Sequence, residues 1–431
     1  MASIAVQRGS GNSLLYSGVK DLLRCDSAEV VEGIARYVIS QHRSIRFVSR
    51  FVERTKRTPI PALLTLLAWT RSFLSVRPDG PLSGVAWIAR LSNERRAIEP
   101  LIASAPELEW TELKFESRIS IRKAVNLGLR NPGSVRRVYK LARRMHLHFD
   151  SFKAMRVIEL LGYYARYVEL FSRGSFAVAL TSNHSNPHGI AFNLAARKYG
   201  VPVVLISHGM PVRPVARLHY ELAVVHCEAA SRTYLDEGCR INRVLTHGRK
   251  QNYVPMRAGP LPARINVGIF LCKDVNELRL KTLVENLLAN ERVARVVIRP
   301  HPKNLWVDID TWIASRGDAR LVRSCGSAVM DDVKGVEVVF GGNSSVLIDA
   351  VTAGVPSAYV DDLDHGSADL HGFVAAGLIH HSEGDPDFDA IWNFYQRPGW
   401  QQILRTFANI DEDESTVLEE TLRILMASIT R

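Results

Sequence analysis

The chain has 431 residues, and its 55 Lys and Arg residues outnumber its 44 Asp and Glu residues, which gives a formal net charge of +11. A hydrophobic fraction of 46% and a charged fraction of 23% are typical of globular proteins and exclude a disordered chain, a collagen-like repeat and a disulfide-held miniprotein. The length predicts roughly two to three domains. The basic excess indicates an anionic partner, and charge alone leaves open whether that partner is nucleic acid, a phospholipid surface or a phosphate-bearing small molecule.

Cysteine spacing and hydropathy both indicate a cytoplasmic protein. The five cysteines are odd in number, lie far apart and form no CxxC pair, a pattern typical of a reduced compartment. Residues 1–18 lack the basic region and continuous apolar run of a secretory signal. The most apolar stretch, residues 60–68, is far shorter than the ~20 residues that span a bilayer. We therefore expect no membrane-spanning segment.

Residues 1–80 are predicted to form a helical N-terminal segment, because apolar residues recur at helical spacing in 19–23, 30–39 and 45–52. Strand and helix signals alternate from residue 81 onward. A long basic helical region at 119–171, broken at 131–133, precedes a series of short apolar strands. We assign residues 81–255 to a first Rossmann-like domain, which would bind the acceptor if the protein is a transferase.

A second domain is predicted after a linker at 252–263 that contains three prolines and a glycine. Apolar strands alternate with helices over 264–431, which closes with helices near 388–408 and 415–429. Near-continuous apolar strands separated by helices indicate parallel sheets covered on both faces. The predicted fold class is therefore α/β, with two Rossmann-like doubly wound domains facing a cleft and a helical N-terminal extension. Ligands of such sheets bind beyond the carboxyl ends of the strands.

The most specific local pattern is Gly341-Gly342-Asn343-Ser344-Ser345, between a predicted strand and a predicted helix. Glycines allow close backbone approach, and hydroxyls with free N–H groups at a helix N-terminus suit a phosphate. A plain serine N-cap would produce the same pattern. Asp349, one helical turn after Ser345, is placed to contact a ribose or a base.

Two histidines follow predicted strands in the two domains. The first is His301, in Arg299-Pro300-His301-Pro302, where two prolines fix the turn. His301 and Arg299 could bind a diphosphate or protonate a leaving phosphate. The second is His208, in Ser207-His208-Gly209-Met210-Pro211, which could deprotonate an attacking hydroxyl from the opposite side of the cleft. In both cases a rigid turn with a structural histidine is the alternative.

Other polar clusters carry weaker signals. Asn183, His184 and His188 join a strand to its helix and are expected to line the floor of the cleft, with a solvent-facing loop as the alternative. Gly238 is expected to end a short helix after Asp236 and Glu237. The carboxylates that follow the strand at 357–360 have no ligand spacing that defines a metal site, so neither a metal nor a cofactor is predicted.

Together, the motifs at 299–302, 341–345 and 208–211 resemble those of GT-B glycosyltransferases of bacterial surface-polysaccharide synthesis. These include CDP-glycerol glycerophosphotransferases, polysialyltransferases and capsule Kdo transferases. The resemblance covers roughly residues 175–380. It implies that His301, Ser344 and Ser345, in the donor-binding domain 264–431, bind the phosphate and base of a CMP- or CDP-linked donor, and that His208 is the catalytic base. It also implies a metal-independent transfer of a sugar, or of a glycerol-phosphate-like unit, to a glycan or lipid-linked glycan acceptor.

The basic stretch at 122–156 permits other interpretations. A nucleic-acid-binding protein would explain the charge, but no RNA- or DNA-binding signature is present and aromatic residues do not interleave with the basic ones, so no nucleic-acid partner is predicted. Apolar residues at partly helical spacing among the basic ones suit contact with an anionic membrane surface, and a solvated helix face suits them equally. A non-catalytic GT-B subunit is a third alternative.

Overall fold

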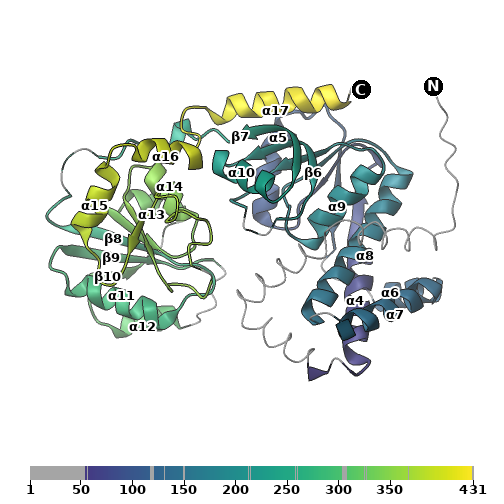
Figure 1. Ribbon diagram of the computed structural model, residues 1–431, viewed down its shortest axis with the longest axis horizontal. Coiled ribbons are helices and arrows are strands. Elements are labelled where there is room, and N and C mark those ends of the chain that lie inside the picture. Colours follow the sequence, from purple (N-terminus) through teal and green to yellow (C-terminus); the bar gives the residue numbers. More distant parts are fainter. Residues whose placement is uncertain are drawn as a thin grey trace.

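The computed structural model describes residues 54–55, 57–116, 121–130, 132–148, 151–211, 213, 215–257, 259, 261–302, 308–324, 326, 328–366 and 368–429. The helices predicted before residue 54 lie outside this part of the chain. The described elements form two α/β domains, with β6 and β7 in one and β8, β9 and β10 in the other (Figure 1).

The first domain is built on a seven-stranded sheet with the order β1-β3-β2-β4-β5-β6-β7. The edge strand β1 runs antiparallel to β3, and the other neighbours pair in parallel, as the all-apolar strand pattern predicts. The strands are β1 (Val76–Asp79), β2 (Ser83–Ile88), β3 (Trp110–Phe115), β4 (Ser175–Thr181), β5 (Val203–Ile206), β6 (His219–Val225) and β7 (Arg240–Thr246).

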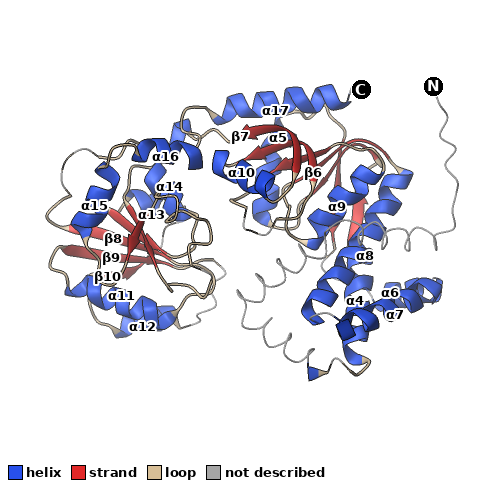
Figure 2. Cartoon of the chain, viewed as in Figure 1, coloured by secondary structure: helices blue, strands red, loops and turns tan. Residues whose placement is uncertain are grey.

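Helices cover both faces of this sheet (Figure 2). On one face, α8 packs between α4 and α9 and buries an aromatic core that includes Tyr167 and Phe192, whose ring centroids are 5.3 Å apart. On the other face, α5 packs over Val85 and Val178. The described helices from residue 60 to β7 are α4 (Ile60–Ser75), α5 (Ser92–Ser104), α6 (Ile121–Arg130), α7 (Pro132–His148), α8 (Ser151–Arg173), α9 (Pro187–Lys198) and α10 (Glu228–Asp236).

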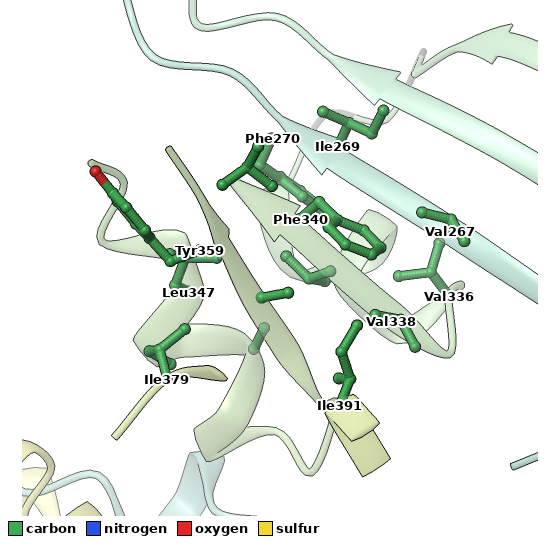
Figure 3. Packing of buried hydrophobic residues seen from close by; sticks show 14 of the residues in the cluster. Val267, Ile269, Phe270, Val336, Val338, Phe340, Leu347, Tyr359, Ile379 and Ile391 are labelled. Atoms are coloured by element: carbon green, nitrogen blue, oxygen red, sulfur yellow. The ribbon is translucent and has the colours of Figure 1, made fainter. Parts of the chain in front are cut away.

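The second domain has a parallel six-stranded sheet with the order β10-β9-β8-β11-β12-β13. Numbered within the domain, this is the 3-2-1-4-5-6 order of dinucleotide-binding folds. Phe340 lies at the centre of its core, with Val267, Val338 and Leu347 around it (Figure 3). The strands are β8 (Ile265–Phe270), β9 (Val293–Arg299), β10 (Leu321–Arg323), β11 (Val338–Gly341), β12 (Ser357–Val360) and β13 (His380–Ser382).

Helices separate most strands of the second sheet and close the described part of the chain. They are α11 (Glu277–Ala289), α12 (Ile309–Ser315), α13 (Val329–Lys334), α14 (Val346–Thr352), α15 (Phe388–Gln396), α16 (Trp400–Phe407) and α17 (Glu414–Ile429). The predicted α/β class with two doubly wound sheets is confirmed by this topology. Gly238 also ends α10 as predicted, with a left-handed φ of 87°.

Two parts of the chain depart from the predicted arrangement. Residues 60–79, predicted to belong to a separate helical segment, form α4 and the edge strand β1 of the first domain. The closing helix α17 was assigned with the second domain, but it packs against the first, where Val417, Ile424 and Leu425 complete the core under α5 (Figure 1). The chain therefore crosses between the domains twice. At the crossing, the Arg249 N–H donates to the Asn409 carbonyl at 2.6 Å, and Asn409 Nδ2 donates to Thr246 Oγ1 at 2.8 Å.

Candidate active site

A cavity of about 590 Å³ lies between the two domains. From the first domain it is lined by residues of α5 and by residues that follow β5, β6 and β7, at the carboxyl edge of the sheet where ligands of α/β folds bind. From the second domain it is lined by α13 and α14. The lining residues with ionisable or hydroxyl side chains are Arg96, Ser207, His208, His226, His247, Arg249, Ser345, Asp349, Thr352 and Glu414.

His208 is fixed in this cavity by the loop after β4. Its Nδ1 lies 2.7 Å from the carbonyl oxygen of Ser182 and 3.0 Å from the hydroxyl of the same residue. A carbonyl oxygen can only accept a hydrogen bond, so we assign the proton of the neutral ring to Nδ1. Nε2 then carries the lone pair, which is the arrangement that a general base requires.

Two further histidines lie beside His208 and were not singled out by the sequence. The rings of His226 and His247 are 5.2 Å apart, and His247 Nε2 donates to the Ser207 carbonyl at 3.2 Å. Burial, together with the neighbouring His247 and Arg249, lowers the pKa of His226 to about 3, and burial also lowers the pKa of His247. Both rings are therefore neutral at physiological pH and contribute polar surface but no charge.

Asp349 lines the cavity from α14, as a ribose-binding or base-binding role would require, and it is paired across the domains. Arg249, just after β7, donates from Nη1 to Asp349 Oδ1 at 2.7 Å. The side chains are 20% and 32% exposed, respectively, so the pair is accessible from the cavity. The sequence did not predict Arg249, because it is a lone arginine next to a linker.

The loop 341–345 is divided between structural and cavity-facing residues. A Cβ at Gly342 would collide with the carboxylate of Asp364. Asn343 donates to Asp364 from its backbone N–H at 2.7 Å and from Nδ2 at 3.0 Å, and its Oδ1 accepts from Leu370 N–H at 2.7 Å. Gly342 and Asn343 thus anchor the loop to the segment after β12, and their predicted phosphate contacts stay predictions.

The two serines of that loop differ in position. Ser345 occupies the N-cap position of α14 and lines the cavity, yet its side chain makes no capping hydrogen bond. Ser344 Oγ instead accepts from the Val346 N–H at 3.3 Å. The simple capping explanation therefore does not account for the Ser345 hydroxyl.

Arg299 and His301 are not part of the cavity lining described above. Arg299 is bound on one side by an ion pair with Asp332, and it donates to the carbonyls of Gly326 and Ala328 at 3.1 and 3.2 Å. It therefore holds the loop between β10 and α13. His301 lies exposed beyond the end of β9. Of Arg299, His301, Ser344 and Ser345, the described cavity is lined by Ser345. The predicted grouping of the four around a phosphate stays a prediction.

Asn183, His184 and His188 are buried behind the cavity and do not line its floor as the sequence predicted, with exposed fractions of 2%, 7% and 1%. Two of them hydrogen-bond to other residues of the same domain: Asn183 Nδ2 donates to Glu94 Oε1 at 2.6 Å, and His184 Nδ1 lies 2.8 Å from the Tyr234 hydroxyl. Burial and the nearby His208 lower the pKa of His184 to about 3.

Glu94 is a further residue that the sequence analysis missed. It is 1% exposed and accepts from the backbone N–H groups of Arg90 and Leu91 at 2.6 and 3.1 Å, besides the Asn183 amide. Burial raises the pKa of Glu94, but the facing His188 at 3.7 Å and these donors outweigh it and hold that pKa at about 2. In the structure Glu94 lies three residues after Leu91, the N-cap residue of α5, which is the position of the glutamate in a capping box.

The chain is similar to solved structures at low sequence identity. No family model matches the chain, and no curated sequence matches it significantly. Similar solved structures include UDP-GlcNAc 2-epimerase from Neisseria meningitidis bound to UDP-GlcNAc, at 11% identity over 80% of this chain and 99% of that one, with a TM-score of 0.45.

Two other similar structures are transferases or polymerases by name. The glycosyltransferase SnogD from Streptomyces nogalater has 12% identity over 80% of this chain and 100% of that one, with a TM-score of 0.40. The wall teichoic acid polymerase TagF, soaked with CDPG, has 10% identity over 90% of this chain and 98% of that one, with a TM-score of 0.41. Since these scores are low, we argue function from this chain's own residues.

Proposed function

We propose that this protein is a glycosyltransferase, or a glycerophosphotransferase-like enzyme. It would move a unit from a nucleotide-activated donor, CMP- or CDP-linked, to a hydroxyl of a bacterial surface glycan or its lipid-linked form. The observation that carries this proposal is His208, which lies in a cavity between two Rossmann-like domains with Nδ1 held by the Ser182 carbonyl. That arrangement supports a base directed at an acceptor bound between the domains.

The proposed reaction proceeds by proton transfer and displacement. His208 Nε2 takes the proton of the acceptor hydroxyl, and the acceptor oxygen forms a bond to the transferred unit. The bond between that unit and the nucleotide phosphate breaks, and the phosphate leaves with the electron pair. Ser345, facing the cavity at the start of α14, is placed to stabilise the leaving phosphate. The roles of His301, Ser344 and Arg299 in donor binding, and independence from metal, stay predictions.

The identity of the nucleotide is tested by thermal shift with CMP, CDP, UDP and GDP, because a ligand that binds only the folded protein raises its melting temperature.

The catalytic base is tested with His208→Asn, which should lower transfer to an added acceptor by about 10²- to 10⁴-fold while leaving the nucleotide-induced shift in place. His219→Asn is the matched control, since His219 begins β6 at the opposite edge of the sheet and bonds Asn242 at 3.3 Å. Full transfer by His208→Asn would contradict the assignment.

We further propose that the helical corner formed by α4, α6 and α7 contacts an anionic membrane surface (Figure 1). The exposed side chains of α7 include Arg136, Arg143 and Arg144, while its opposite face packs inward through Ala142 and Met145. The adjoining α4 exposes a run of leucines, Leu63, Leu64 and Leu67. Among the described helices, none has the length and apolar character needed to cross a bilayer. Basic residues near an anionic leaflet each contribute about 1 kcal/mol, so such a corner supports reversible attachment.

A further inference from the structure

The cationic side chains that line the cavity are Arg249 and Arg96. The three cavity histidines do not supply positive charge for a phosphate. Burial lowers the pKa of His226 and of His247, and His208 acts as the base in the proposed reaction. Arg299, the cation that the sequence predicted for this role, pairs with Asp332 and is not among the residues that line this cavity. A donor phosphate in this cavity therefore meets positive charge on the first domain and the crossing segment.

Arg249 is well placed for such a contact. Its backbone is fixed by the hydrogen bond from its N–H to the Asn409 carbonyl at 2.6 Å, and the side chain spans to α14, next to Ser345. The guanidinium carries five donors, of which the described contacts show Nη1 engaged with Asp349. Its planar fork matches phosphate oxygens in two-point contacts. Arg96 faces the same space from α5, where it makes one long bond to the Ser92 carbonyl at 3.4 Å.

We infer that Arg249 is the residue that binds the donor phosphate, and that Asp349 occupies its guanidinium until the donor arrives. This inference rests on the proposed function, because it assigns the donor subsite of the same cavity. Binding of the phosphate exchanges one anionic partner of Arg249 for another, so the carboxylate of Asp349 competes with the ligand. The apparent affinity is then reduced by the fraction of molecules in which Arg249 is engaged.

The alternative is that the Arg249–Asp349 pair only holds the two domains together. The two interpretations predict opposite changes in phosphate affinity for Asp349→Asn relative to Arg249→Gln. If the pair is only a latch, neutralising either partner breaks it and changes ligand affinity in the same direction. If Asp349 competes with phosphate, Arg249→Gln weakens binding and Asp349→Asn strengthens it.

Inorganic pyrophosphate is the probe that distinguishes them. It has no ribose or base, so its affinity does not depend on any contact between Asp349 and the nucleoside. Titrated into the full-length protein by calorimetry, it should bind Arg249→Gln at least tenfold more weakly than wild type, and Asp349→Asn severalfold more tightly. Arg292→Gln and Asp389→Asn are matched controls, since that pair is 2.9 Å apart and lies outside the cavity lining; both should bind as wild type does. CDP should bind wild type more tightly than pyrophosphate and should lose affinity in Arg249→Gln, whereas cytidine should not.

Several results would overturn the inference: unchanged pyrophosphate affinity in Arg249→Gln, a loss in Asp349→Asn as large as that in Arg249→Gln, or no pyrophosphate binding by wild type at 10 mM. Should Arg249→Gln fail to fold, the gain or loss in Asp349→Asn decides alone. Failure of the proposed function is a separate result, since it appears as a wild-type protein that binds pyrophosphate but no nucleotide in the thermal-shift panel.

Discussion

At the scale of single residues, His208 depends on a buried chain of polar contacts. Glu94 on α5 accepts from the amide of Asn183, and the preceding Ser182 holds His208 Nδ1 through its carbonyl. The same Glu94 accepts from the backbone N–H groups that begin α5, the helix that also lines the cavity. One buried carboxylate therefore couples the position of a cavity wall to the position of the proposed base.

Glu94 also gives a prediction for stability against pH. Its pKa is about 2 in the folded protein and 4.5 for an ordinary glutamate, so its ionised form stabilises the fold above pH 4.5, and that contribution is lost as pH falls from 4.5 toward 2. Glu94→Gln should lower the free energy of unfolding of the first domain by about 1–3 kcal/mol at neutral pH. The gap between wild type and variant, measured by urea unfolding, should narrow as pH falls through that window.

The control for this experiment is Glu99→Gln, because Glu99 is exposed on the same helix. It should differ little from wild type at every pH. A gap between wild type and Glu94→Gln that stays constant from pH 7 to pH 3 would show that the carboxylate contributes through shape and not through its charge.

Residue identity could be predicted better than residue role. The sequence placed His208 and Ser345 just after apolar strands, and both line the cavity, because local periodicity fixes where a strand of such a sheet ends. Local sequence gives no information on which side chains pair across 100 positions, as Arg249 and Asp349 do. For the same reason, the sequence did not show that Arg299 pairs with Asp332 on α13.

At the scale of elements, the closing helix α17 packs against the first domain, far from it in sequence. Leu425 is fully buried in the first domain, among residues such as Val85 and Val178 that precede it by more than two hundred positions. The apolar spacing of 415–429 predicted a helix, and the helix is present at Glu414–Ile429. Which domain it covers depends on the path of the chain through 408–414.

Leu425→Ala should therefore destabilise the first domain and not the second. A buried Leu→Ala change removes about 2–5 kcal/mol of stability through lost burial and the cavity that remains. Hydrogen exchange should show faster amide exchange in β4 and β6, with β8 and β11 unchanged. Met426→Ala is the control, since Met426 is 40% exposed, and it should leave exchange in both sheets near wild type. Faster exchange confined to the second sheet would contradict the placement of α17.

At the scale of the whole molecule, the net charge of +11 includes two separate groups of basic residues. Two arginines face the cavity between the domains, and a larger number of exposed basic side chains lies on α6 and α7, away from it. The first group is tied to the proposed chemistry. The second group forms the proposed membrane-contacting surface.

Flotation with vesicles tests the second group. The protein should float with vesicles that contain an anionic phospholipid and remain at the bottom with neutral ones, and binding should weaken with added salt. Replacing Arg136, Lys140 and Arg143 with Gln should reduce flotation severalfold, while the same number of changes on the second domain, at Arg292, Arg316 and Arg323, should not. Equal flotation of both triple variants would contradict the proposed surface, as would a salt-sensitive shift of RNA or DNA mobility of similar strength.

The sequence by itself determined the class of fold, the two domains and the approximate positions of strands and helices, because apolar periodicity and Gly or Pro breaks act over a few residues. It also predicted roles for His208 and the loop 341–345, of which His208 and Ser345 line the cavity. The tertiary structure decided the domain that α17 covers, the burial of Asn183, His184 and His188, and the partners of Arg249, Asp349 and Arg299. These depend on contacts between residues far apart in the chain, which are fixed only when the sheets and their crossing segments are assembled.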